Sequence, residues 1–72
     1  MTAKEWLTSF AAVLGVDAPS DEQISDLLRL AGEAAHASER IAAPVACWLT
    51  ARAGLSPAAA LAVLEKWQQS GV

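Results

Sequence analysis

Residues 20–44 have the sequence SDEQISDLLRLAGEAAHASERIAAP, and the first part of this stretch decides the fold class. Ser20 and Gln23 form a capping-box pattern, in which each side chain binds a backbone N–H that a helix start leaves open. The two acidic residues after Ser20 place negative charge at the positive end of the helix dipole. The apolar residues that follow recur at helical spacing and are Ile24, Leu27, Leu28, Ala31, Ala34 and Ala35. The pattern predicts an amphipathic helix over residues 21–37.

The second part of the stretch predicts a bend followed by another helix. Pro44 disfavours helical dihedrals at Ala43, and proline is favoured as the first residue of a helix. We therefore place the break between Ser38 and Ala43 and begin the next helix at Pro44. Its helical period continues to Ala53, where Gly54 supplies the left-handed residue that commonly follows a last turn.

Two outer helices complete the pattern. Thr2 and Glu5 repeat the capping box and predict a helix over residues 3–14. Ser56 followed by Pro57 opens a last helix. Its apolar side consists of Ala60, Leu61, Val63, Leu64 and Trp67.

Residues 1–72 are expected to form a single small helical domain, because no segment alternates with the period of a strand. The predicted class is all-α, either a compact four-helix bundle or an orthogonal four-helix array. Seventeen alanines leave little side-chain bulk between the helices, so we expect their backbones to approach closely. Trp6, Trp48 and Trp67 are then expected to fill most of the core.

The core of such a domain is small. A chain of 72 residues removes only about 60% of its unfolded surface from water. The single Cys47 cannot form an internal disulfide, and one cysteine with one histidine cannot complete a structural zinc site. We therefore expect stability to depend on unusually good helix packing or on a partner subunit.

Charge and hydropathy exclude two classes of partner. Five basic residues against eight acidic ones give a net charge of −3, which does not provide the basic footprint of a nucleic-acid-binding protein. The longest uncharged run, residues 53–64, has 12 residues and is too short to cross a bilayer. The N-terminus lacks the basic segment followed by an apolar core of a secretory signal, so a cytoplasmic protein is expected.

No residue pattern predicts catalysis, a metal or a cofactor. Glu33 and His36 have the spacing used in di-iron bundles, but such a site needs that pair twice. Cys47 has no titrating residue one helical turn away, which favours a buried, inert thiol. The domain is therefore expected not to be an enzyme.

The residues around the bend are the candidate partner-binding site: His36, Arg40, Pro44, Trp48 and Arg52. Arginine and tryptophan are enriched among the residues that anchor protein interfaces. Alternatives remain for each aromatic or basic group. Arg40 could join the N-terminus of the following helix in an anion site, or it could pair with an acidic side chain. Arg52 could lie over the Trp48 ring. Trp48 itself could be a core residue with one exposed edge.

Residues 34–54, AAHASERIAAPVACWLTARAG, carry a family resemblance. The segment resembles the signature of small, uncharacterised actinobacterial helical domains at Ala35, His36, Arg40, Ala43, Pro44, Trp48 and Leu49. An early Trp6 with a following LGV and a late Trp67 extend the resemblance over nearly the whole chain. Ile41 departs from the pattern, which often has proline after the arginine.

The resemblance implies a functional setting. Members of that family are similar to domains fused to, or encoded beside, molybdenum-cofactor guanylyltransferase-like proteins and formate dehydrogenase accessory factors. We therefore expect a non-catalytic accessory or subunit domain that docks on a molybdenum-cofactor enzyme, such as formate dehydrogenase, or on its maturation protein. The alternatives are binding of a phosphate-bearing pterin or nucleotide intermediate, and a self-associating bundle that forms a homodimer.

Overall fold

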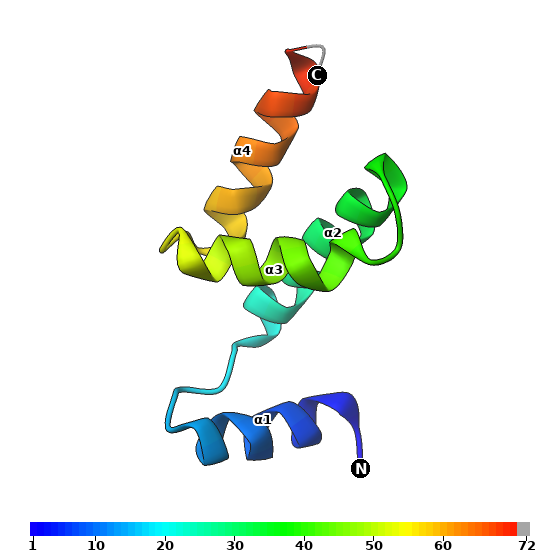
Figure 1. Cartoon of the computed structure of the whole chain (residues 1–72). Helices are drawn as coiled ribbons and strands as arrows, with labels where there is room; N and C mark the ends of the chain where they lie inside the picture. Colours follow the sequence, from blue (N-terminus) through cyan, green and yellow to red (C-terminus); the bar gives the residue numbers. More distant parts are fainter. Residues whose placement is uncertain (71–72) are drawn as a thin grey trace.

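The computed structural model describes residues 1–70 and contains four helices. They are α1 (Ala3–Leu14), α2 (Asp21–Ala37), α3 (Ala42–Arg52) and α4 (Pro57–Gln69), and no strand is found among the described residues (Figure 1). The prediction of an all-α four-helix array is confirmed.

The helix starts follow the side-chain signals in the sequence. In the first capping box the Glu5 carboxylate accepts the Thr2 N–H at 2.8 Å, and the Thr2 hydroxyl accepts the Glu5 N–H at 3.1 Å. Ser20 and Gln23 repeat both bonds at the same distances. Ser56 caps α4. The predicted bounds of the first two helices are confirmed, because local hydrogen bonds set them.

The start of α3 differs from the prediction. The helix begins at Ala42, and Pro44 is its third residue instead of its first. Two turn hydrogen bonds start it early: the Ala42 N–H donates to the Glu39 carbonyl at 2.9 Å, and the Ala43 N–H donates to the Arg40 carbonyl at 3.2 Å. Pro44 is tolerated there because the first turn of a helix does not need its N–H.

The core lies where α2 packs against α3 and α4. Leu30 of α2 meets Ala60 and Leu61 of α4, and partly buried side chains surround this cluster: Leu27, Cys47 and Leu64. No residue of α1 belongs to the cluster, and α1 lies apart from the body formed by the other three helices (Figure 1). An extended connection joins α1 to α2.

The prediction that the three tryptophans fill the core is wrong. Trp6, Trp48 and Trp67 are 53%, 57% and 57% exposed, respectively. The buried hydrophobic residues of the described chain are instead Ala11, Leu30, Ala34, Ala60 and Leu61. The short alanine side chains let the helix backbones approach closely, so little space is left between them for an indole ring. On the outer surface, no further helix of the described chain covers the tryptophans.

The exposed surface is large for the size of the chain. The accessible area is 5483 Å², whereas a folded monomer of 7.5 kDa is expected to expose roughly 4,200 Å². The radius of gyration is 13.0 Å, compared with about 11 Å for a compact domain of this length. The core is therefore smaller than the sequence predicts.

No single helix of the described residues is long and apolar enough to cross a membrane. α3 and α4 reach the length and composition of a span only when taken together, and the two are bent by 114° at the break between them.

Candidate functional site

Three of the five predicted site residues form a stripe along α3. Pro44, Trp48 and Arg52 follow one another at four-residue spacing, which places them on one side of a helix, and all three are exposed. Cys47, which packs against the core, lies about 100° around the helix from Trp48. We call these three residues the α3 stripe.

Trp48 and Arg52 contact each other within this stripe. The guanidinium carbon of Arg52 lies 5.0 Å from the centre of the Trp48 ring, within the range of a cation–π contact. The prediction that Arg52 lies over Trp48 is confirmed. Such a contact contributes about 0.5–1 kcal/mol at an exposed site, and it orders both side chains without burying either.

His36 lies on a different face. It is exposed in the last turn of α2, two residues after Ala34, which faces the core. Two residues correspond to about 200° around a helix, so His36 points away from the core side of α2. It borders a shallow depression with Leu28, Arg29, Gly32 and Glu33. The α3 stripe therefore does not extend to His36.

Arg40 occupies the turn that leads into α3 and is exposed. Within residues 1–70 the ion pairs are Lys4 with Asp21 and Arg29 with Glu65, so the alternative in which Arg40 pairs with an acidic side chain is not observed there. Its guanidinium has no competing internal partner in this part of the chain. Arg40 lies two residues before α3 and Arg52 is its last residue, so the length of the helix, about 17 Å, separates their backbones.

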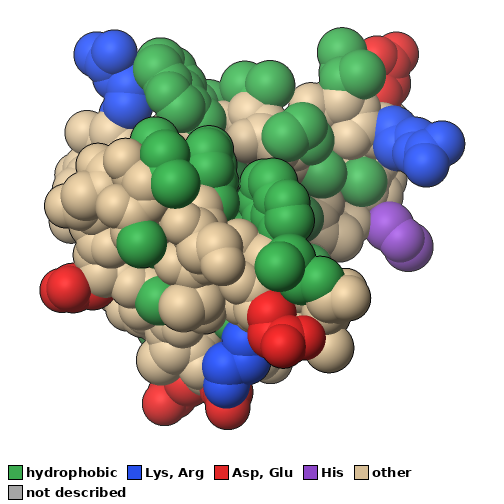
Figure 2. Space-filling view, turned by 90° about the horizontal axis from the view of Figure 1, so that it is seen from below, with side chains coloured by type: hydrophobic (Ala, Val, Ile, Leu, Met, Phe, Trp, Pro, Cys, Tyr) green, Lys and Arg blue, Asp and Glu red, His purple; other side chains and the backbone are tan. Residues whose placement is uncertain are grey.

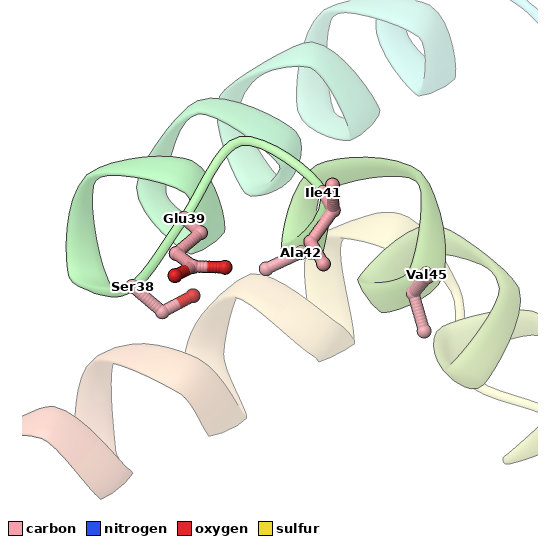
Figure 3. A pocket seen from close by; sticks show the side chains of 5 residues that line it. All are labelled: Ser38, Glu39, Ile41, Ala42 and Val45. Atoms are coloured by element: carbon pink, nitrogen blue, oxygen red, sulfur yellow. The ribbon is translucent and has the colours of Figure 1, made fainter.

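The start of α3 has an acidic and apolar character. A hollow at this point is lined by Ser38, Glu39, Ile41, Ala42 and Val45 (Figure 3). The Glu39 carboxylate and the Ser38 hydroxyl point into the hollow from the end of α2 and the loop. The Glu39 carboxylate makes no capping hydrogen bond to α3, but its negative charge near the helix start disfavours an anion there.

The reactive side chains do not converge. No group of three or more histidine, cysteine, aspartate or glutamate side chains that could hold a metal ion is found in the described chain. Cys47 packs against the core from α3, whereas His36 faces outward from α2. Within residues 1–70 the Cys47 thiol and the His36 imidazole are therefore not brought together as nucleophile and base.

An apolar groove between α3 and α4 was missed by the sequence reasoning, which assigned its residues to the core. Val45 and Leu49 of α3 face Leu64 and Trp67 of α4 across a groove of about 460 Å³. A second hollow of about 310 Å³ shares Leu49, Leu64 and Trp67 and continues toward the α3–α4 connection. Figure 2, which views the molecule from the side on which α1 lies, shows hydrophobic side chains gathered over that face, with charged groups mostly at its margin. The available signal was that α3 is apolar nearly all the way around, more than one packed face requires.

Comparison with known proteins places the chain in a family. The comparisons with curated proteins and with solved structures find no match. One family does match, over residues 1–70, which is nearly the full length of the chain. The chain therefore belongs to the family described as "Domain of unknown function (DUF6457)".

Proposed function

We propose that this domain is a non-catalytic accessory domain that binds another protein through the α3 stripe and Arg40. The observation that carries the proposal is the exposed Trp48 with the Arg52 guanidinium 5.0 Å above its ring. Tryptophan and arginine are the residues most often found as energetic anchors of protein interfaces. Trp48 and Arg52 do not pack in the core of the domain, so both side chains are free to contact another protein.

A non-catalytic role is supported by the separation of the reactive groups. The Cys47 thiol is partly covered by the core, and His36 lies on the outward face of α2. A nucleophile needs a base within hydrogen-bond reach. An active site would therefore require groups from the partner.

The proposed partner is a cytoplasmic molybdenum-cofactor enzyme, such as formate dehydrogenase, or a protein that matures it. The resemblance of residues 34–54 to accessory domains of such systems supports this choice. The α3 stripe also constrains the chemistry of the partner. Arg40 precedes α3 and Arg52 is its last residue, with Trp48 between them, so the matching surface should present an apolar pocket flanked by carboxylates.

Binding to purified candidates tests the proposal. The domain is titrated against a formate dehydrogenase and against its maturation protein, and the dissociation constant is measured by isothermal titration calorimetry. Removal of an anchor residue costs about 2 kcal/mol or more, so Trp48→Ala should weaken binding by at least ~30-fold.

Trp67→Ala is the matched control. Trp67 has the same exposed fraction as Trp48, 57%, but it lies in the α3–α4 groove instead of the α3 stripe. Binding that survives Trp67→Ala and is lost with Trp48→Ala supports the proposal. Absence of binding to both candidates, or equal effects of the two substitutions, would overturn it.

A further inference from the structure

Two apolar surfaces of this chain lack a partner within residues 1–70. The first is a ridge on α1 formed by Trp6, Phe10 and Val13, which are 53%, 44% and 81% exposed. We call these three residues the α1 ridge. The second is the α3–α4 groove described above. Both surfaces are apolar and exposed, so contact between them would remove apolar area from water.

The α1 ridge is held away from the body of its own chain. Lys4 at the start of α1 forms an ion pair with Asp21 at the start of α2. Ala11, 6% exposed, lies on another side of the helix and accepts the Val16 N–H at 3.0 Å through its carbonyl. The Trp6 and Phe10 rings contact each other, with centres 5.1 Å apart. The ridge therefore faces outward while a different edge of α1 meets the connection to α2.

The groove can accept a short apolar helix. Its two hollows are lined without any charged side chain, so a helix placed there would bury no unpaired charge. The 12 residues of α1 extend over about 18 Å, close to the ~20 Å of the 13-residue α4 that forms one wall. No residue of α1 lines either hollow in its own chain.

The excess surface matches the requirement of a dimer. The chain exposes about 1,200 Å² more than the ~4,200 Å² expected for a folded monomer of its mass. A standard protein interface covers about 800 Å² on each partner. A second copy that covers the α1 ridge and the groove can therefore account for the excess.

We propose that the α3–α4 groove binds α1 of a second copy of this chain, and that the exchange is reciprocal. Each copy then contributes one helix and one groove, and two-fold symmetry closes the assembly with neither surface left open. In this structure α1 is joined to the start of α2 by the Lys4–Asp21 pair, and no residue of α1 lines the groove of its own chain.

The dimer contact does not use the stripe proposed to bind a partner. Pro44, Trp48 and Arg52 line neither of the two hollows. Self-association and partner binding can therefore succeed or fail separately.

Sedimentation equilibrium of the full chain tests the inference. The wild type should have twice the 7.5 kDa mass of one chain. Phe10→Asp on the ridge and Leu49→Asp in the groove should each weaken the dimer by at least ~30-fold, the effect of losing an interface anchor. Ala12→Asp and Ala51→Asp are the matched controls, because both residues are exposed on the same helices and neither lines the groove. These controls should remain dimeric, and circular dichroism verifies the helical content of every variant.

Mixing the two disruptive variants separates this arrangement from other dimers. The Leu49→Asp chain keeps an intact ridge and the Phe10→Asp chain keeps an intact groove, so the mixture should regain one of the two contacts and form a heterodimer. A wild type that stays monomeric at about 100 μM, where even a dimer of micromolar affinity forms, would overturn the inference. A dimer that resists both substitutions, or one broken by Phe10→Asp alone, would also overturn it. If a variant loses its helical content, Phe10→Ala and Leu49→Ala replace it in the same mass measurement.

Discussion

Replacement of Leu30 by alanine should remove a large part of the stability of this domain. Leu30 is only 4% exposed and lies at the centre of the cluster with Ala60 and Leu61. Those two neighbours project from α4, and the methyl group of Ala60 is too short to fill the cavity that alanine at position 30 would leave. The cost should therefore come close to that of an unrelaxed core cavity.

The size of the effect follows from the small core. Truncation of a buried leucine to alanine costs about 2–5 kcal/mol. A domain of 72 residues has a total unfolding free energy of roughly 4–11 kcal/mol. The thin core of α2, α3 and α4 places this domain toward the lower end of that range. We expect Leu30→Ala to lower the unfolding free energy by about 3 kcal/mol, and the melting temperature by at least ~10 °C.

Urea denaturation followed by far-ultraviolet circular dichroism measures this change. Leu28→Ala is the control, because Leu28 lies on the same helix but is 69% exposed. Its substitution should change the unfolding free energy by less than ~0.5 kcal/mol. A loss below ~1 kcal/mol for Leu30→Ala, or equal losses for the two variants, would show that the core does not lie where α2 crosses α4.

Three further predictions concern local features. Ser20→Ala removes the hydroxyl that caps α2 and should lower the unfolding free energy by about 1 kcal/mol in the same urea assay, whereas an unchanged midpoint would contradict the capping role. Gly15 has a φ of +76°, so Gly15→Ala should lower the unfolding free energy by about 1 kcal/mol. Gly32 lies inside α2 with open space where a Cβ would be, so Gly32→Ala should raise the unfolding free energy by about 0.5–1 kcal/mol. Changes of the same sign in the two variants would refute this reasoning. The Thr2 N–H and hydroxyl lower the pKa of the Glu5 carboxyl below its usual value. The contribution of this cap to the unfolding free energy should therefore be fully present above the pKa that Glu5 has in the unfolded chain. It should be lost as the pH falls through the pKa that Glu5 has in the folded chain. An NMR titration of Glu5 should show a higher apparent pKa in Thr2→Ala, and an unchanged titration would contradict the assignment.

The helix bounds could be predicted because their causes are local. Two capping boxes and the left-handed Gly15 lie within a few residues of the helix ends that they define. The start of α3 has no such signal, because Ile41 precedes it without a side-chain cap and two backbone hydrogen bonds in the turn begin the helix. Proline at position 44 indicated the right region but not the right residue.

The positions of the large side chains could not be predicted from the same pattern. Periodicity shows which side of a helix is apolar, but it does not show whether another helix covers that side. The α1 ridge has the spacing of a core face, yet no helix of the described chain packs on it. The α3 stripe was predictable, because residues four apart share a helix face whatever surrounds them. The direction in which His36 points could not be predicted, because it depends on which side of α2 packs against α3 and α4.

The alanine content explains both the thin core and the exposed aromatic residues. Where α2 meets α4, Ala34 and Ala60 are buried and their short side chains allow the backbones to lie close together. A gap of this size accepts a leucine such as Leu30 but not an indole, so Trp48 and Trp67 can only point outward or into a groove. Larger residues in place of these alanines would enlarge the internal core and would separate the helices that shape the groove. The same composition that limits the stability of the isolated chain therefore creates the two surfaces on which a protein partner and a second copy are proposed to bind.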